Sequence, residues 1–393
     1  MSQLTQPSLK VLEINTFLIA SYILLIASFC VIMVQMKGEM RQMRTFDLVK
    51  ESESLMNNNI VNLLSSIHEY KGKQELYIEA KTDILSSLLS IAKIQSTSAS
   101  NKIEGIYTTD QRMSVIVNNK VEPKNRNEEE IAGYRDVLNT IHENYDYINI
   151  SSSVILQFHR DLYKYSGISY GGKFKNSQNY IEETLEDGTK RIRFTPLSPV
   201  ETPIAIEELC NSYNEIISKE EIDPLLVIPI FILDFVSIHP FNDGNGRMSR
   251  LLTLLLLYKA GYIVGKYISI EKIIEETKET YYDSLENSSV NWHNNENNYS
   301  YFVEYYLGVI LSAYKEFSSR VEYITNKKMT AIERISILFM ESISPINKAY
   351  LMERCPDISE TTIERSLSTL LNEGKIEKIS GGRFTEYKWK NSR

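Results

Sequence analysis

The chain has 393 residues, of which 43 are Lys or Arg and 51 are Asp or Glu, so its formal net charge is −8 at neutral pH. This length suggests about two or three domains, and a hydrophobic content of 42% is enough for a sizeable core. The acidic balance argues against a protein that mainly coats nucleic acid. The only cysteines, Cys30, Cys210 and Cys355, lie far apart, which gives no disulfide framework and favours a reducing compartment.

The N-terminal region contains the run FLIASYILLIASFCVIMV at 17–34, which has no charge and no proline. It is about long enough to cross a bilayer. Basic residues follow it, and by the positive-inside tendency they place the rest of the chain in the cytoplasm. We predict an extension over 1–44 with a transmembrane helix at 17–34 that anchors the protein in the inner membrane. The alternatives are a buried helix, or a stretch that precedes a later start at Met36 or Met40.

The region 45–120 is predicted to be an N-terminal helical region, because apolar residues recur at helical spacing. A polar connector is expected around Gly72, between two of its helices. The polar stretch 118–130 indicates a surface connection to further helices, which continue to residue 163.

The segment 167–203 is rich in glycine and proline and changes this helical pattern. Asp187 and Gly188 form a turn signal between the strand-like runs 178–184 and 190–196. The sequence therefore predicts a β-hairpin in an otherwise helical protein.

Two strongly apolar stretches follow. The run 223–238 is apolar on nearly every face and predicts a buried helix, which Pro229 would begin or kink. The run 248–262 predicts a second buried helix, which ends at Gly261. Between the two runs lie the nine residues HPFNDGNGR, at 239–247.

These nine residues combine groups that suit polyphosphate chemistry. Gly244, Asn245 and Gly246 precede a helix, whose free N–H groups and partial positive charge attract anions, and the Asn245 amide adds a side-chain donor. Arg247 and Arg250 lie in the first turns of that helix and could pair with phosphate oxygens. Asp243 is a hard oxygen ligand suited to Mg²⁺. His239 is available to accept a proton near neutral pH.

The stretch HPFNDGNGRMSR, 239–250, resembles the Fic family motif HxFx(D/E)GN(G/K)RxxR at every fixed position. The resemblance extends over roughly residues 60–310. It implies transfer of AMP from ATP to a Ser, Thr or Tyr hydroxyl of a target protein. On that resemblance His239 is the general base, Asp243 the Mg²⁺ ligand and Gly244–Gly246 the anion hole. Arg247 and Arg250 would hold the β- and γ-phosphates, and glycine at 246, where the family's Doc-type kinases carry lysine, favours AMP transfer.

A second motif lies upstream, in STSASNKIEGI. Ser100, Glu104 and Gly105 resemble the inhibitory motif (S/T)xxxE(G/N) of Fic proteins. The Glu104 carboxylate is expected to pair with Arg247 and to take the place of the γ-phosphate, so that ATP is misaligned for in-line attack. The alternative is that Ser100 caps a helix and Glu104 is a solvated surface charge. Some family members with this glutamate also remove AMP from their targets.

The resemblance also suggests what surrounds the motif. Tyr281 and Tyr282 fall where the family places nucleotide-contacting residues. The hairpin, taken as 178–203, would be a flap that binds the target protein by strand addition. The protein could also modify itself, and a homodimer is a further open prediction.

The C-terminal region 329–393 is predicted to be a winged helix-turn-helix domain, because three helical patterns precede a small hairpin. It carries ten Lys or Arg and nine Asp or Glu, a net charge of +1. This balance is poor for strong DNA binding, so a protein-interaction role is favoured over a DNA-binding one.

Taken together, the sequence predicts a mainly α fold: a Fic-type helical bundle over 121–315 with a β-hairpin flap, followed by the winged helix. The favoured function is a protein adenylyltransferase that uses ATP and Mg²⁺ and is autoinhibited by Glu104. The alternatives are a nucleotide-sensing DNA-binding regulator and a Fic transferase of another nucleotide or phosphate group.

Overall fold

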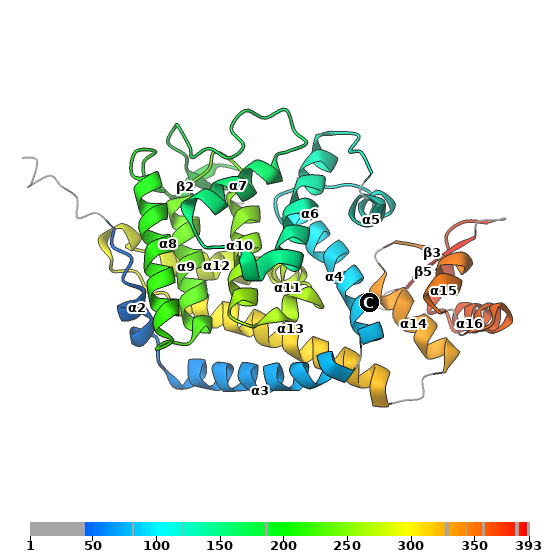
Figure 1. Ribbon diagram of the computed structural model, residues 1–393. Helices are drawn as coiled ribbons and strands as arrows, with labels where there is room; N and C mark the ends of the chain where they lie inside the picture. The colour runs from blue at the N-terminus through cyan, green and yellow to red at the C-terminus, as the bar shows by residue number, and fades with distance from the viewer. Residues whose placement is uncertain are drawn as a thin grey trace, which may run out of the picture. The chain divides into compact units, whose positions relative to one another are not determined.

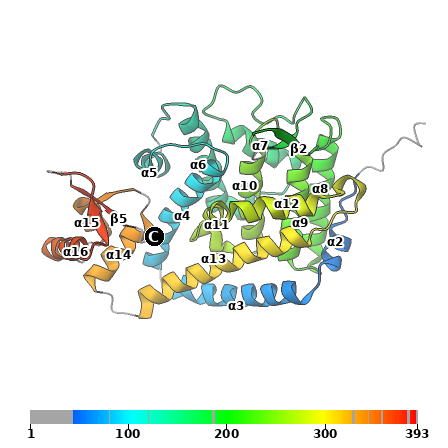
Figure 2. The same ribbon diagram turned by 180° about the vertical axis from the view of Figure 1, so that it is seen from behind.

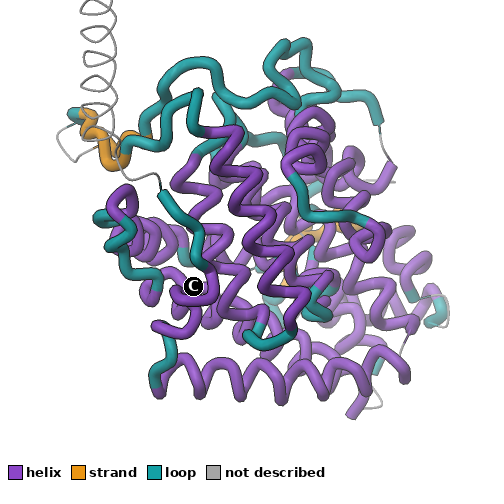
Figure 3. Tube along the Cα trace, turned by 60° about the vertical axis from the view of Figure 1, so that its left-hand side comes forward, coloured by secondary structure: helices purple, strands orange, loops and turns teal. Residues whose placement is uncertain are grey.

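The computed structural model describes residues 44–390 except 81, 120, 185–187, 327–329, 343, 356–357 and 382–384. Over these residues the chain is mainly helical, and its strands form two small sheets (Figures 1 and 3). This confirms the predicted mainly α fold. The predicted membrane span 17–34 lies outside the described residues. Within the part that the structure describes, no helix is both long and apolar enough to cross a bilayer.

The described residues fall into two compact units. The smaller unit contains Thr45 and His293–Glu296, where the backbone N–H and the hydroxyl of Thr45 both donate to Asn295 Oδ1, at 3.1 and 3.3 Å. The larger unit contains Phe46–Trp292 and Asn297 onward. The predicted division of the chain at residues 44, 120, 315 and 329 stays a prediction.

Two buried helices form the centre of the larger unit, α9 (Pro224–Ile238) and α10 (Asn245–Lys259). They pack against each other, and nearly every side chain of both is buried. Asp223 caps the N-terminus of α9 by accepting a hydrogen bond from Leu225 N–H, and Pro224 occupies the first helical position, where its missing N–H costs nothing. Pro229 lies inside α9 and does not begin it. The two apolar runs thus predicted both helices correctly.

Two long helices, α3 (Asn58–Ala80) and α13 (Ser300–Asn326), lie side by side (Figures 1 and 2). The expected connector around Gly72 is wrong, because α3 continues through it. Ile67 and Gln74, seven residues apart on one helical face, are both buried, so the packed face carries on past the glycine. A Cβ at Gly72 would meet nothing within 4 Å, so this position lies on the open side of the helix.

Further helices of the larger unit surround this pair directly or through a neighbour: α2, α8 and α12 contact α9, and α4 and α6 contact α10. They include α4, which ends at the predicted inhibitory motif, and α6, which packs on α4, α7 and α10. Their bounds are α2 (Leu48–Ser54), α4 (Thr82–Ile103), α5 (Asp110–Asn119), α6 (Arg126–Asn144), α7 (Ser152–Leu162), α8 (Thr202–Lys219), α11 (Ile270–Glu276) and α12 (Lys278–Ser289), with 3-10 turns η1 (Tyr145–Tyr147), η2 (Ile263–Lys266) and η3 (Trp292–Asn294).

The predicted hairpin is present. Strand β1 (Ile181–Thr184) pairs antiparallel with β2 (Lys190–Phe194), in a register that places Glu183 opposite Arg191. Asp187 of the predicted turn lies outside the described residues, whereas Gly188 has the positive φ of 80° that favours glycine.

The C-terminal module has its own apolar core. Helices α14 (Ala331–Glu341), α15 (Lys348–Arg354) and α16 (Glu360–Asn372) accompany a sheet of strand order β3-β5-β4, formed by Ile346–Asn347, Glu386–Trp389 and Ile376–Lys378. The three predicted helices and the hairpin β4–β5 are therefore observed, and the short strand β3 is an addition. The assignment of this module as a winged helix stays a prediction.

Candidate active site

His239 lies at the C-terminal end of α9, in the left-handed conformation with φ 51° and ψ 63°. Its ring Nδ1 is 3.2 Å from the carbonyl oxygen of Val236. Because a carbonyl only accepts hydrogen bonds, this contact assigns the ring proton to Nδ1 and leaves the lone pair on Nε2. Burial lowers the pKa of His239 to about 4, so the imidazole is neutral at physiological pH. The ring is thus able to accept a proton at Nε2.

The loop between α9 and α10 is closed by the side chain of Asn245. Its Oδ1 accepts from the N–H of Phe241 at 2.9 Å, and its Nδ2 donates to the Phe241 carbonyl at 2.8 Å. Both ends of this amide therefore bond the loop, and its predicted role as a donor to a phosphate stays a prediction. The following turn positions the backbone of Gly244, whose φ of 82° favours glycine.

Asp243 is the acidic residue of this loop, and 47% of its side chain is accessible. Its Oδ1 accepts from the N–H of Gly244 at 2.6 Å and lies 3.9 Å from Arg247 Nη2. An exposed carboxylate beside an arginine-rich anion site suits Mg²⁺, which keeps several waters and takes one or two protein carboxylates together with phosphate oxygens. The donor set therefore fits the predicted metal ligand, whose role stays a prediction.

Arg250 is buried and held from the end of α4. Its Nε donates to Ser100 Oγ at 2.8 Å, and its Nη2 donates to the Ser100 carbonyl at 2.8 Å. The same Nη2 pairs with Glu104 Oε1 at 2.7 Å. The carboxylate of the upstream motif thus covers the second arginine of the 239–250 motif, and the alternative that Glu104 is only a solvated charge is wrong.

The expected pairing of Glu104 with Arg247 is corrected. Arg247 Nη1 lies 2.7 Å from Glu130 Oε2, and its Nη2 donates to the hydroxyl of Tyr163 at 2.8 Å. Three residues advance an α-helix by about 300°, so Arg247 and Arg250 leave α10 on neighbouring but different sides. Arg250 extends toward α4, whereas Arg247 extends toward α6 and α7.

Glu130 is a site residue that the sequence analysis missed. It falls in the polar stretch assigned to the surface, yet it is only 4% exposed. Besides pairing with Arg247, its Oε1 accepts from Arg126 Nε at 3.1 Å. Buried acids of this kind require a positive partner, but no spacing in the sequence identifies which arginine supplies it. Arg247 also has a buried Nε without a hydrogen-bond partner among the described residues.

The geometry of Glu104 follows from the way α4 ends. Gly105 has a φ of 76°, the N–H of Ile106 bonds to the carbonyl of Asn101, and the N–H of Gly105 bonds to that of Lys102. These two bonds are a Schellman motif, in which Glu104 is the C-cap and Gly105 the left-handed residue after it. Ser100 lies inside the last turns of α4 and does not cap its start.

Glu104 also touches the predicted anion hole. A Cβ built on Gly246 would lie only 2.2 Å from Glu104 Oε1. The carboxylate therefore lies against the backbone of the first turn of α10, which is the predicted position of a phosphate oxygen. Only glycine at 246 leaves room for this arrangement.

Tyr281 and Tyr282, on α12, lie near the same charges. Their ring centroids are 5.3 Å apart, Tyr281 is buried and Tyr282 half-buried. Burial raises the pKa of both hydroxyls, and the charges of Arg250 and Glu104 act on them as well. The structure thus places both tyrosines beside the motif, and their contact with a nucleotide stays a prediction.

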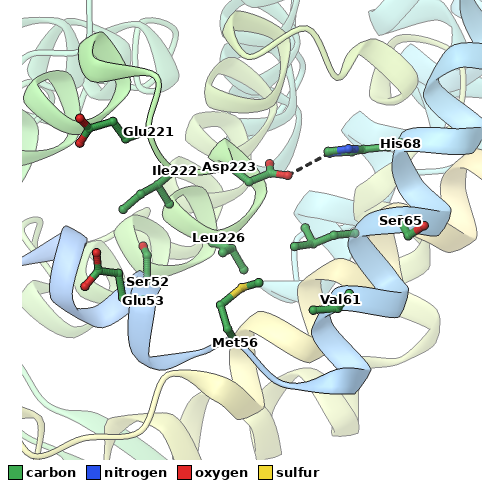
Figure 4. Close-up of a pocket in the computed structure, with 11 residues that line it drawn as sticks. Ser52, Glu53, Met56, Val61, Ser65, His68, Glu221, Ile222, Asp223 and Leu226 are labelled. Carbon is green, nitrogen blue, oxygen red and sulfur yellow. Dashed lines mark ion pairs between the residues drawn. The ribbon is translucent and has the colours of Figure 1, made fainter.

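A separate hollow of about 520 Å³ lies between α2, α3 and the start of α9 (Figure 4). Met56, Val61 and Leu226 supply part of its apolar lining, and His68 Nε2 pairs with Asp223 Oδ2 at 2.9 Å on one side. Because none of the predicted site residues lines this hollow, it is distinct from the candidate active site.

Comparisons with known proteins agree with this geometry. Residues 149–257 match the Fic/DOC family, so the chain contains a Fic/DOC family domain. It is similar to the protein adenylyltransferase fic-1 of Caenorhabditis elegans, with 31% identity over 113 residues, 29% of this chain and 20% of that protein. The protein adenylyltransferase Fic of Aedes aegypti is 29% identical over 144 residues, 36% of this chain and 24% of that protein. The chain therefore spans about a fifth to a quarter of the length of these two relatives.

The fold comparison covers more of the chain. A crystal structure of a Fic family protein from Desulfovibrio desulfuricans has a TM-score of 0.57 and 21% identity, and it covers 86% of this chain and 98% of that chain. This likeness shows that the fold is the predicted Fic-type helical bundle.

Proposed function

We propose that the protein is a Fic-type adenylyltransferase that transfers AMP from ATP to a Ser, Thr or Tyr hydroxyl of a target protein. The observation that carries the proposal is the convergence on the N-terminus of α10: His239 precedes it, and the two buried guanidinium groups of Arg247 and Arg250 flank it. The similarity of this domain to proteins named protein adenylyltransferases supports the same activity.

In the proposed reaction His239 Nε2 removes the proton from the target hydroxyl. The hydroxyl oxygen then forms a bond to the α-phosphorus of ATP, while the bond from that phosphorus to the bridging oxygen of the β-phosphate breaks, and pyrophosphate leaves. The hydrogen bond from Nδ1–H to Val236 keeps the ring oriented during the proton transfer. General-base help of this kind contributes roughly 10² to 10⁴ in rate.

The phosphates would bind at the start of α10. Backbone N–H groups of the first turn point out of the helix and are free to bind an anion. Arg250 and Arg247 supply positive charge on two sides of this turn, and such preorganised charge needs no rearrangement during the reaction. Asp243 would hold Mg²⁺, which neutralises phosphate charge when bound.

Glu104 would keep this site inactive. Its carboxylate lies beside Gly246 and neutralises Arg250, so a bound triphosphate cannot contact the backbone at Gly246 and the Arg250 guanidinium at the same time. With the γ-phosphate displaced, the α-phosphate loses its alignment with the incoming hydroxyl. The proposal includes removal of AMP from a modified target by the same site.

The target protein would bind at the hairpin β1–β2. Each strand of a two-stranded sheet has one edge whose N–H and C=O groups are unpaired within the sheet, so an extended target segment can add to it as a third strand. Autoinhibition, the target site, self-modification and a homodimer are all parts of this proposal.

The deciding experiment is mass spectrometry of Glu104→Gly protein incubated separately with each nucleoside triphosphate and Mg²⁺. Addition of one AMP from ATP supports the proposal, because the added mass identifies the transferred group. Addition of a phosphate or of another nucleotide would replace AMP transfer with that reaction. No added mass with any nucleotide, together with tight duplex DNA binding in a gel shift, would favour the nucleotide-sensing DNA-binding regulator.

A further inference from the structure

Four successive carbonyl groups around His239 accept hydrogen bonds from two side chains and one backbone N–H of the segment 171–180. Lys175 Nζ donates to the carbonyl of Ile238 at 3.0 Å, and Lys175 N–H donates to that of Pro240 at 2.8 Å. Asn179 Nδ2 donates to the carbonyls of His239 and Phe241, at 3.3 and 2.9 Å. The loop that carries the predicted base is thus bonded residue by residue to a single partner segment.

These bonds matter because His239 has an unfavourable backbone. A left-handed conformation is unfavourable for a residue with a Cβ and persists only where the surroundings impose it. The backbone of His239 follows the buried helix α9 and turns toward the loop at this point. Lys175 and Asn179 therefore hold the turn from which the imidazole of His239 extends.

Lys175 is built into this position. Its side chain is only 3% exposed, and its Nζ donates to Asn179 Oδ1 at 2.9 Å as well as to Ile238. Burial lowers the pKa of Lys175 to about 8, which leaves it mostly charged at pH 7. Both hydrogen bonds of Nζ go to neutral oxygens, and the nearby carboxylate of Glu201 acts on the Lys175 charge in the opposite sense to burial.

We infer that Lys175 is a positioning residue for His239, one that fixes the orientation of the base through its hydrogen bonds to the loop 238–241. The inference rests on the proposed function, because it assigns Lys175 a role toward the base of that reaction. Lys175 touches no nucleotide-binding residue of the motif, so its role is exerted through the loop 238–241.

The electrostatic part of the inference follows from the charges that face His239. Burial lowers the pKa of His239 most, and the charge of Lys175 lowers it further, whereas Glu104 from α4 and Asp243 from the loop before α10 raise it. In Glu104→Gly protein, removing the positive charge leaves the Asp243 carboxylate unopposed. The imidazole then binds a proton more readily, and its pKa rises.

The test uses full-length protein with Glu104→Gly, so that activity is measurable, and compares added Lys175→Met with Lys173→Met. Lys173 lies two residues away and is exposed, and its replacement makes the same change in net charge. We expect Lys175→Met to lower kcat about tenfold to a hundredfold with an unchanged KM for ATP, because misplacing a base by about 1 Å has this cost. Lys173→Met should change neither quantity.

Two further variants separate position from charge. Lys175→Arg keeps both and should retain most of the activity. Lys175→Gln keeps a hydrogen-bond donor without the charge, so its kcat should fall less, while its pH profile should move. If Lys175→Met does not fold, Lys175→Gln carries the same test.

A titration of the His239 ring by NMR, assigned with His239→Gly, gives a readout that does not depend on transfer activity. The midpoint should rise by about one pH unit in Lys175→Met and Lys175→Gln, and stay in place in Lys175→Arg and Lys173→Met. A kcat equal to that of Lys173→Met together with an unmoved midpoint would overturn the inference. If the Glu104→Gly parent transfers nothing, the proposed function fails, while the midpoint still tests Lys175.

Discussion

The carboxylate of Glu104 lies 2.7 Å from the guanidinium of Arg250, and its Oε1 occupies the space beside Gly246. One side chain thus covers both an arginine that is predicted to bind phosphate and the backbone of the predicted anion hole. The contact has a second part, since Ser100 in the same helix accepts two hydrogen bonds from Arg250. Removal of Glu104 alone should therefore free the anion hole and leave Arg250 anchored by Ser100.

Glu104→Gly is expected to raise self-labelling with AMP about tenfold to a hundredfold. Hydrogen bonds to charged groups contribute about 1.5–3 kcal/mol, and loss of this one shifts the site toward the state that binds ATP productively. Initial rates with radiolabelled ATP check the prediction, with Glu122→Gly as control because Glu122 is exposed in a loop away from the motif. A rate equal to or below that of the wild type would show that Glu104 does not inhibit.

His239→Gly is expected to lower AMP transfer by about 10²- to 10⁴-fold while the protein remains folded. Glycine is preferred to alanine for this test because φ at this position is 51°, which glycine adopts without strain. The Glu104→Gly background provides measurable activity, and circular dichroism confirms the fold. Retained labelling in the double variant would assign proton removal to another group.

Replacement of Glu130 should affect stability more than replacement of Glu104. Glu130 is 5% exposed and pairs with the buried Arg247, so Glu130→Gln leaves a buried charge without its partner, which costs roughly 3–5 kcal/mol. Glu104 is 33% exposed, and Glu104→Gln keeps a side-chain acceptor for Arg250, which also keeps its two hydrogen bonds to Ser100, so this variant should lose less stability than Glu130→Gln. Urea unfolding measures both, with the neighbouring Glu129→Gln as control. Equal losses in the two variants would mean that Glu130 is not the permanent counter-ion of Arg247.

The protein should lose stability in mild acid because buried histidines must become charged. His159 Nε2 lies 3.0 Å from the Asp243 carbonyl, its Nδ1 accepts from Gly172 N–H at 3.0 Å, and its ring stacks on Phe241. Burial lowers its pKa from 6.5 to about 4. As the pH falls, the unfolded chain therefore binds the proton at a higher pH than the folded protein does. The stabilising contribution of neutral His159 is present above pH 6.5, and about 3 kcal/mol of it is lost as the pH falls toward 4.

Thermal unfolding between pH 4.5 and 7.5 checks this prediction. His159→Phe keeps an aromatic ring against Phe241 but cannot be charged, so its stability should be lower at pH 7.5 and should change less with pH. A pH dependence as steep as that of the wild type would assign the effect to other groups, of which His142, whose pKa burial lowers to about 3, is the first to examine.

The sequence predicted the elements whose residues share one clear pattern. The runs 223–238 and 248–262 are apolar on all sides, and both form buried helices. Asp187 and Gly188 marked the hairpin. Around Gly72 the prediction was wrong, because a single glycine was weighed more heavily than the packing of its neighbours against α13, which outweighs a helix penalty of about 1 kcal/mol.

Part of the site was predicted from the sequence, but its ion pairs were not. His239, Arg250 and Glu104 were identified, and the structure brings them together. Glu104 pairs with Arg250 and not with Arg247 because the two arginines extend from different sides of α10. The packing of α4 and α6 determines which acid each arginine reaches, and a linear motif does not contain this information. Glu130 could not be found for the same reason, since its partner lies 117 positions further along the chain and is reached only in the folded state.

The Schellman ending of α4 has a consequence for how the protein could be switched on. Glu104 is the C-cap, so the residue that we propose to be inhibitory lies where a helix frays most readily. Activation would then need neither displacement of α4 nor disruption of the core. Unwinding of its last turn is a local fluctuation whose frequency any molecule bound near Gly105 could change.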